Sequence, residues 1–158
     1  MLDNATLRGV KCDDKVVALV AFRTQEVDGV VVAWVPLLGV LPNDATTNWG
    51  VPKDCADGKP WGGRGLGSFL MHLVKEAVKQ EANGRSVRVE LQCIQAEDSP
   101  CKFYDKHGFR PSAQETPSMP GVDLKPGHVL LEWTPDATPT VRGLQRPRSP
   151  LYCRGKSS

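Results

Sequence analysis

The feature that most constrains this chain is a run of glycines that leads directly into an amphipathic segment, within residues 61–83. Four glycines lie within six positions: Gly62, Gly63, Gly65 and Gly67. The apolar residues after them recur at helical spacing and predict a half-buried helix of about four turns that ends at Asn83-Gly84. The apolar face is Leu66, Phe69, Leu70, Leu73 and Ala77, and the polar face is His72, Lys75, Glu76, Lys79 and Gln80. A loop of this kind leaves backbone N–H groups bare at a helix start, which predicts an anion site.

The spacing of the glycines excludes two familiar phosphate loops. The nucleotide-triphosphatase loop requires a lysine after its last glycine, whereas Gly67 is followed by Ser68 and Phe69. The dinucleotide-binding pattern Gly-x-Gly-x-x-Gly requires a glycine three positions after the second one, and neither Gly65 nor Gly67 has it. The anion of this site therefore belongs to another kind of ligand.

Length and composition set the broad class. A chain of 158 residues suits one domain with a single core. Its net charge of +2 does not by itself indicate nucleic acid, and its five cysteines are odd in number and form no C-x-x-C pair, which favours reduced thiols. The N-terminal residues lack the apolar core of a signal peptide, and the longest apolar run, Val30–Pro42, is shorter than the roughly 20 residues of a membrane helix. These features predict a soluble cytoplasmic protein without a membrane partner.

Short strands are predicted on both sides of the helix. Residues 5–11 and 15–23 form one hairpin, and Asp28-Gly29 starts a second one that leads into the apolar run Val30–Leu41. Pro36 predicts a break or bulge in that strand, since proline cannot donate to a ladder. With the helix and the alternating strand Val87–Cys93, this run predicts a right-handed βαβ unit with parallel strands.

The remaining elements follow in order. Glu97–Lys106 reads as a short helix capped by Asp98 or Ser99, and strands at 109–111 and 128–133 enclose a loop at 112–127. Residues 1–133 are thus predicted to form the domain. Residues 134–158 are predicted to be a disordered, basic, proline-rich tail, because cations outnumber its single acid, Asp136.

Two motifs together resemble the GNAT superfamily of acyl-CoA-dependent N-acyltransferases. The segment Gly62–Gly67, GGRGLG, is similar to the family's pyrophosphate loop, [Gln/Arg]-x-x-Gly-x-[Gly/Ala]. The segment Cys101–Phe109, CKFYDKHGF, resembles the family element that ends in Phe-Tyr-x-x-x-Gly-Phe. The resemblance implies a fold that contains both helices and strands, of the class α/β (α+β). Its sheet is mixed and mostly antiparallel, around a central parallel βαβ unit.

The same resemblance implies a cofactor and the residues that hold it. Acetyl-CoA would lie where the parallel strands Val30–Leu41 and Val87–Cys93 splay apart. Its pantetheine arm would run along the first strand, and its pyrophosphate would sit on the backbone amides of the glycine loop beside the Arg64 side chain. The residues implied in cofactor binding are Gly39, Val40, Leu41, Gly62, Gly63, Arg64, Gly65, Leu66, Gly67 and Ser68.

The implied reaction is direct attack of a primary amine, on a small molecule or on a peptide or protein, at the thioester carbonyl. By resemblance, Tyr104 is the acid that protonates the departing thiolate. Glu90 is the base proposed here, with Asp44 and water as alternatives, because the strand Val30–Leu41 has no carboxylate. His107 reads as a charge partner of a helix end. No clustered Cys, His and acidic residues predict a metal.

Several departures from the family pattern keep an alternative open. Gly62 stands where the family has Gln or Arg, the loop Asn43–Pro60 is long, and the usual N-terminal strand and helices have almost no room. A second subunit in a homodimer, or the tail, would then complete the acceptor groove. The alternative to an N-acetyltransferase is a catalytically degenerate member that binds coenzyme A or a protein. The basic tail is the one feature that suggests nucleic acid or a nuclear location, and its spaced cations more often form a solvated tail.

Overall fold

The protein is described by a computed structural model that covers residues 4–12, 14–40 and 65–135. Six strands and two helices follow one another along these residues. In chain order they are β1 Thr6–Cys12, β2 Lys15–Val27, β3 Val30–Val40, α1 Leu66–Ala82, β4 Ser86–Ile94, α2 Cys101–Lys106, β5 Arg110–Pro111 and β6 His128–Trp133.

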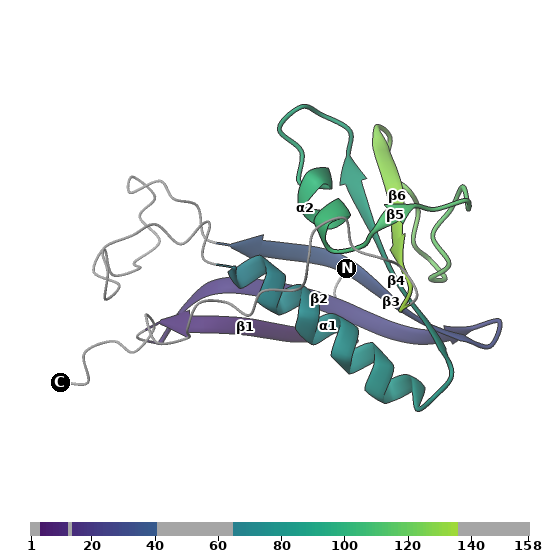
Figure 1. Ribbon diagram of the computed structural model, residues 1–158, viewed down its shortest axis with the longest axis horizontal. Coiled ribbons are helices and arrows are strands. Elements are labelled where there is room, and N and C mark those ends of the chain that lie inside the picture. Colours follow the sequence, from purple (N-terminus) through teal and green to yellow (C-terminus); the bar gives the residue numbers. More distant parts are fainter. Residues whose placement is uncertain (1–3, 13, 41–64, 136–158) are drawn as a thin grey trace.

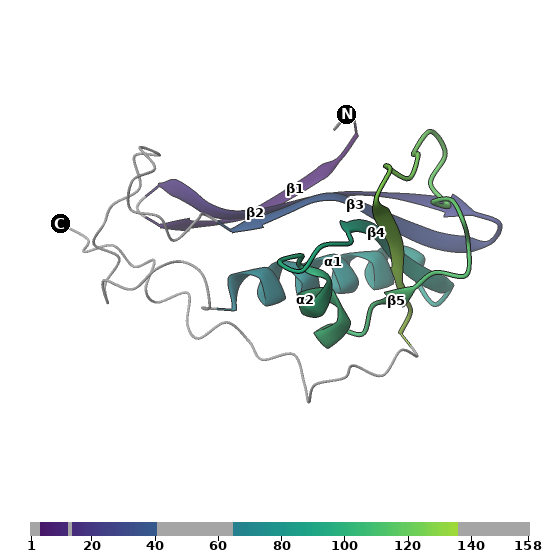
Figure 2. The same cartoon turned by 90° about the horizontal axis from the view of Figure 1, so that it is seen from above.

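All six strands belong to one sheet with the order β1-β2-β3-β4-β6-β5 (Figure 1). Only β3 and β4 run parallel, and every other neighbouring pair is antiparallel. α1 joins the two parallel strands and packs with α2 on one face of the sheet (Figure 2). The mixed, mostly antiparallel sheet with a central parallel βαβ unit is therefore confirmed.

The turns are formed by residues that tolerate a left-handed backbone. Asp28 and Gly29 have φ values of 51° and 79° and connect β2 to β3 as the sequence predicts. Asn83 has a φ of 49°, and its N–H donates to the Lys79 carbonyl, which closes α1 at the predicted position.

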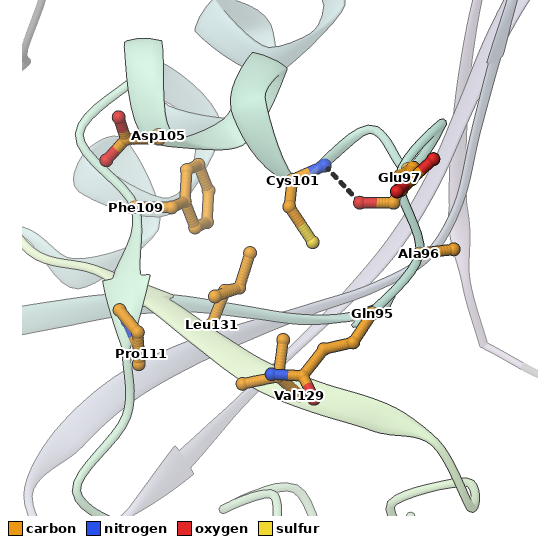
Figure 3. A pocket seen from close by; sticks show the side chains of 10 residues that line it. Gln95, Ala96, Glu97, Cys101, Asp105, Phe109, Pro111, Val129 and Leu131 are labelled. Carbon is orange, nitrogen blue, oxygen red and sulfur yellow. Dashed lines mark hydrogen bonds between the residues drawn. The ribbon is translucent and has the colours of Figure 1, made fainter.

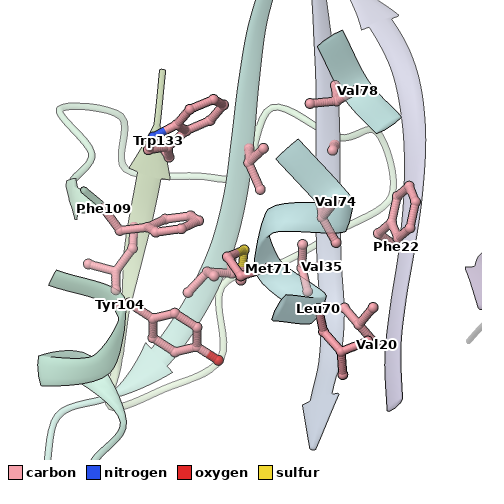
Figure 4. Packing of buried hydrophobic residues seen from close by; sticks show 14 of the residues in the cluster. Val20, Phe22, Val35, Leu70, Met71, Val74, Val78, Tyr104, Phe109 and Trp133 are labelled. Atoms are coloured by element: carbon pink, nitrogen blue, oxygen red, sulfur yellow. The ribbon is translucent and has the colours of Figure 1, made fainter. Parts of the chain in front are cut away.

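The core lies between α1 and the sheet (Figure 4). The residues that α1 buries there show that the predicted orientation of the helix is wrong. Leu70, Met71, Val74 and Val78 are fully buried, each worth about 1.5–3 kcal/mol of apolar transfer free energy. Lys75, which was predicted on the solvent face, is only 4% exposed. The buried stripe is rotated from the predicted one because Met71 and Val74 point inward, and Lys75 follows them.

The connection 112–127 covers part of the opposite face of the sheet. Met119 packs there with Val32, Trp34 and Leu130 in a second apolar cluster. Glu90, which the alternating pattern of β4 placed on a thinly covered polar face, is 0% exposed beneath this connection. The expectation of a bare face is wrong at this place, because a segment without helix or strand can bury a sheet as well as a helix can.

The start of the second helix differs from the prediction, and two predicted segments lie outside the described residues. α2 begins at Cys101 rather than at Glu97, after a turn at residues 97–100. No helix within the described ranges is long and apolar enough to cross a membrane. The loop Asn43–Pro60 with Asp44, and the tail apart from Thr134 and Pro135, lie outside the described residues.

Candidate functional site

The two parallel strands at the centre of the sheet separate partway along their length. The ladder runs from the pair Val30 and Ser86 to the pair Trp34 and Glu90, and ends there. β3 continues to Val40 and β4 to Ile94, and the two strands diverge (Figure 1). From Val35 onward, the edge of β3 that faced β4 therefore has no ladder partner among the described strands.

A β-bulge at Pro36 explains where the strands separate. In the pairing of β2 with β3, Arg23 lies opposite Trp34 and Ala21 lies opposite Leu37, so one β2 residue faces both Val35 and Pro36. A bulge bends its strand and increases the local twist. Proline also has no N–H to give to β4. The bulge predicted from Pro36 is thus confirmed, and it lies directly after the last pair with β4.

The N-terminus of α1 is built to present backbone N–H groups. Gly65 precedes the helix with a φ of 80°, and the Phe69 N–H makes a hydrogen bond of 2.9 Å to its carbonyl oxygen. The amides of Leu66, Gly67 and Ser68 come before this bond and therefore point out of the helix end. The first turn contains no acidic residue, and no side chain caps it. The positive end of the helix dipole is thus available to an anion.

Gly67 allows α2 to pack closely on the first turn of α1. A Cβ added at Gly67 would lie 3.2 Å from Cζ of Phe103 and 3.9 Å from Cγ2 of Val40. The absence of a side chain at this position therefore has a packing reason, in addition to any role toward a ligand. The contact brings α1, α2 and the end of β3 together at one point.

Ser68 makes the second link between the helices. Its Oγ lies 3.0 Å from Nε2 of His107, the residue that follows α2. The His107 ring packs on Phe103 with 4.6 Å between centroids. Burial, with the nearby Lys75 and Lys106 charges, lowers the pKa of His107 from 6.5 to about 4. The ring is therefore neutral near pH 7, and its interpretation as a charged partner of a helix end is wrong.

Lys75 supports the same junction from the core side. Its Nζ donates a hydrogen bond of 2.6 Å to the His107 carbonyl and lies 4.6 Å from the centroid of the Trp133 ring. Burial and the neighbouring Lys79 lower the pKa of Lys75 from 10.5 to about 8. The ammonium thus satisfies a carbonyl at the end of α2, where a cation is favourable.

Tyr104 lies within the core where α2 faces α1. Its ring packs edge-on against Phe103 and Phe109, with centroids 5.3 Å and 5.8 Å away, and it belongs to the same core cluster as Met71 of α1 (Figure 4). Burial, followed by the nearby Cys93 and Cys101 thiols, raises the pKa of Tyr104 to about 12. The hydroxyl is therefore protonated throughout the neutral range.

Glu90 is held on the other side of the sheet, at the last pair before the strands diverge. Its two carboxylate oxygens accept hydrogen bonds from Ser118, at 2.7 Å from the backbone N–H and 2.6 Å from the hydroxyl. Arg88 Nη1 lies 3.5 Å from the same carboxylate. A buried carboxylate is thus stabilised by a residue of the 112–127 connection, and no local pattern in β4 could have indicated that partner.

An open hollow of about 690 Å³ lies beside α2, on the side that faces β6 (Figure 3). Its walls are mostly apolar and include Phe109, Val129 and Leu131. Glu97 and Cys101 also line it. It contains none of the residues predicted to bind the cofactor. It is therefore distinct from the region where β3 and β4 diverge.

The structure brings some predicted residues together and leaves others undescribed. Val40, Gly67 and Ser68 lie at the junction of β3, α1 and α2, with Gly65 and Leu66 in the turn before them. Gly39 is exposed on β3, and Tyr104 lies one turn before His107. Leu41, Gly62, Gly63 and Arg64 lie outside the described residues. The described ranges hold no group of three or more Cys, His or acidic residues that could bind a metal.

Sequence reasoning missed the contact of His107 with Ser68 at this junction, because it interpreted His107 as a charge partner of a helix end. One signal pointed to it: the motif Cys101–Phe109 was singled out, and His107 lies inside it. Its partner, Ser68, is 39 positions away, so only the packing of the helices reveals the contact.

Comparison with known proteins places this geometry in a known architecture. No protein-family model matches the chain, and no curated protein sequence matches it. Among solved structures, the chain is similar to aminoglycoside 6'-acetyltransferase type Ii, with a TM-score of 0.52 and 14% identity over 83% of this chain and 69% of that one. The fold of this chain is GNAT-like.

Two further solved structures are similar at lower TM-scores. Naa50 of Arabidopsis thaliana, in complex with the bisubstrate analogue CoA-Ac-MVNAL, gives 0.46 with 22% identity over 77% of this chain and 67% of that one. Gcn5 of Tetrahymena gives 0.48 with 18% identity over 87% of this chain and 71% of that one. At such identities the GNAT-like fold describes the path of the backbone, and the reaction has to be argued from the site.

Proposed function

We propose that this chain is an N-acetyltransferase that transfers an acetyl group from acetyl-CoA to a primary amine. The observation that carries the proposal is the divergence of β3 and β4 directly beside the uncapped N-terminus of α1. An acyl carrier with a diphosphate and a long amide-bearing arm needs these two features side by side: an anion site and an open strand edge.

In this proposal each part of the cofactor has its own partner. The diphosphate accepts hydrogen bonds from the amides at the start of α1, from Gly65 to Ser68, and Gly62, Gly63 and Arg64 extend the same site. The arm lies along the open edge of β3 at Gly39, Val40 and Leu41, where peptide groups can pair with its amides. Val40 contacts the Gly67 position, so the two parts of the site adjoin.

Tyr104 acts on the departing sulfur in the proposed reaction. The neutral amine attacks the carbonyl carbon, a C–N bond forms, and the C–S bond breaks with its electron pair on sulfur. An ordinary thiol has a pKa of about 8.5, well below the pKa of about 12 of Tyr104. Tyr104 therefore stabilises the thiolate chiefly by donating a hydrogen bond, and full proton transfer to the sulfur would be uphill.

Glu90 is the base in the same proposal. It belongs to the last ladder pair before β3 and β4 diverge, and its side chain shares the β4 face of Arg88 rather than the face covered by α1. Glu90 is 0% exposed beneath the 112–127 connection, so an amine that enters from this face has to displace part of that connection to reach the carboxylate. The carboxylate would accept the proton that the amine must lose.

A second candidate function is acetyl-CoA binding without turnover. It is favoured by one observation: both carboxylate oxygens of Glu90 are already engaged by Ser118. The same carboxylate is 0% exposed, so in this arrangement an amine has no access to it. In that case the fold would serve as a coenzyme A-binding module for a partner.

Binding and turnover separate these candidates. Calorimetry with acetyl-CoA and with coenzyme A tests the cofactor site, and thiol release with a panel of amines and peptides tests transfer. An acetyltransferase binds acetyl-CoA and releases thiol only when an acceptor is present. Binding without release for any acceptor would support the second candidate, and lack of binding would contradict both.

The variant Tyr104→Phe tests the role of the hydroxyl. It keeps the ring contacts with Phe103 and Phe109, so the affinity for acetyl-CoA should change by less than about twofold, whereas kcat falls about 10²-fold or more. A kcat equal to that of the natural chain would remove Tyr104 from the mechanism.

A further inference from the structure

Two cysteine thiols meet at the junction of β4 and α2. Cys93 is buried on β4, and Cys101 is the first residue of α2. The Sγ atoms of both donate to the same acceptor, the Ile94 carbonyl oxygen, at 3.7 Å for Cys93 and 3.6 Å for Cys101. The Cys101 thiol is also close enough to Cys93 to contribute to the raised pKa of Cys93. Both are free thiols, so the pair is a dithiol.

The turn between the strand and the helix holds this dithiol in place. β4 ends at Ile94, and the chain reverses before α2 begins at Cys101. Ser99 Oγ accepts a hydrogen bond of 3.2 Å from the Cys101 N–H and lies 4.0 Å from the Cys93 sulfur. One serine thus fixes the backbone of the second cysteine beside the side chain of the first.

The two thiols differ in access to solvent. Cys101 is half-buried, and its sulfur points into the open hollow between α2 and β6 (Figure 3). Cys93 is 2% exposed, belongs to the core cluster and does not line the hollow. Burial and the neighbouring Cys101 thiol raise the pKa of Cys93 from 9.0 to about 11. A reagent in the hollow therefore meets Cys101 first, and Cys93 is placed to react second.

We propose that Cys93 and Cys101 are a modification site at which a small peroxide produces a reversible disulfide. The Cys101 thiolate attacks one peroxide oxygen, the O–O bond breaks, and hydroxide leaves, so that Cys101 becomes a sulfenic acid. The Cys93 sulfur then gives up its proton and attacks the Cys101 sulfur, the S–O bond breaks, and water leaves. Two thiols are oxidised, one peroxide is reduced, and an added dithiol reverses the change.

The modification lies next to the proposed catalytic tyrosine. Both thiols are close enough to Tyr104 to contribute to its raised pKa, and Tyr104 lies one helical turn after Cys101. A bridge would tie the end of β4 to the start of α2, beside that ring. Formation of the bridge does not depend on any transferase activity, so the test below succeeds or fails independently of the proposed function.

The sequence makes the test unusually direct. Trypsin cuts after Arg88 and Lys102, so one peptide, Val89–Lys102, carries both thiols and no other cysteine. The full chain is treated with hydrogen peroxide, alkylated with iodoacetamide and digested with trypsin, and the peptide masses are measured by mass spectrometry. We expect a peptide that carries no alkyl group and has lost the mass of two hydrogen atoms, and reduction before alkylation should restore two alkyl groups. A glutamate-specific protease cuts this peptide after Glu90 and Glu97, and the two fragments that carry the cysteines should stay joined until reduced.

Two controls ask whether the fold causes the reaction. The synthetic peptide Val89–Lys102 and the urea-unfolded chain have the same spacing without the packing, and we expect the folded chain to form the bridge about tenfold faster or more. Equal rates would overturn the proposal. In Cys93→Ser, Cys101 should accumulate as a sulfenic acid that dimedone traps, whereas in Cys101→Ser the buried Cys93 should stay a thiol.

Two other results would also overturn the proposal. One is a peptide from the natural chain in which both thiols are still alkylated after treatment with peroxide. The other is a bridge from Cys101 to Cys12, Cys55 or Cys153 in place of Cys93.

Discussion

The hydroxyl oxygen of Ser68 lies 3.0 Å from Nε2 of His107, and this contact joins the first turn of α1 to the end of α2. Nδ1 of the same ring is buried and has no hydrogen-bond partner within the described residues. A buried N–H without an acceptor is costly, so the favoured tautomer carries its hydrogen on Nε2, directed at Ser68. The Ser68 hydroxyl then accepts from His107, and its own hydrogen can be donated to an anion at the α1 N-terminus.

Replacement of His107 by Phe should weaken acetyl-CoA binding. The variant fills the same space against Phe103 but removes the donor that orients Ser68. Loss of one oriented hydrogen bond is worth about 1 kcal/mol, which corresponds to an approximately fivefold higher Kd. Calorimetric titration of both chains with acetyl-CoA measures the difference.

The matched variant is His107→Gln, whose amide nitrogen can replace Nε2 as a donor. We expect it to keep most of the affinity that the Phe variant loses. If both variants bind acetyl-CoA as well as the natural chain does, Ser68 needs no orientation by residue 107.

The low pKa of His107 predicts a loss of stability in mild acid. Its pKa is about 4 in the folded chain and 6.5 as an ordinary value, so between these two pH values the unfolded chain binds more protons than the folded one. Stability therefore rises with pH in this window and is lost as the pH falls from about 6.5 toward 4. Urea unfolding across this range should show the loss, and it should be smaller in His107→Phe. An identical pH dependence in both chains would contradict the assignment.

Much of the fold could be predicted because the signals for it are local. Asp28-Gly29 and Asn83-Gly84 supply the positive φ values that a hairpin and a helix end require, whatever surrounds them. Pro36 cannot donate a hydrogen bond, and this fixes the bulge after which the central strands diverge. Features of this kind follow from the chemistry of one or two residues.

The parts that were missed depend on partners distant in the sequence. Lys75 reads as a solvent-facing cation until Trp133 and the His107 carbonyl are placed around it. Glu90 reads as an exposed strand residue until Ser118, 28 positions later, covers it. No periodicity within one element indicates such partners, because irregular connections bring them in.

Gly67→Ala should destabilise the junction of the two helices. The new Cβ would lie 3.2 Å and 3.4 Å from two Phe103 ring atoms, so the ring, with α2, has to give way by a few tenths of an ångström. Overpacking costs about 1–3 kcal/mol. The higher helix propensity of alanine stabilises the folded chain by about 1 kcal/mol, which offsets part of this loss. We expect a net loss of about 1 kcal/mol in urea unfolding, because the shift of α2 is the larger effect.

A second substitution and a neutral site test the cause of that loss. Phe103→Leu should recover stability when combined with Gly67→Ala, since it removes the ring that the Cβ meets. At Gly39 no atom lies within 4 Å of an added Cβ, so Gly39→Ala should leave the free energy of unfolding almost unchanged. Additive effects at positions 67 and 103 would show that the two side chains do not meet.

Glu90→Gln should separate a structural role of this carboxylate from a catalytic one. Two donors of Ser118 point at Glu90, and an amide offers only one acceptor, so one donor would face an NH2 group. The mismatch should cost about 1–3 kcal/mol of stability. Ser118→Ala removes one of the donors at a cost of about 1 kcal/mol and keeps the carboxylate.

If Glu90 is the base, kcat of the folded Gln variant should fall about 10²-fold or more, far beyond the effect of Ser118→Ala. Equal and small losses of kcat in the two variants would restrict Glu90 to holding the 112–127 connection against the sheet.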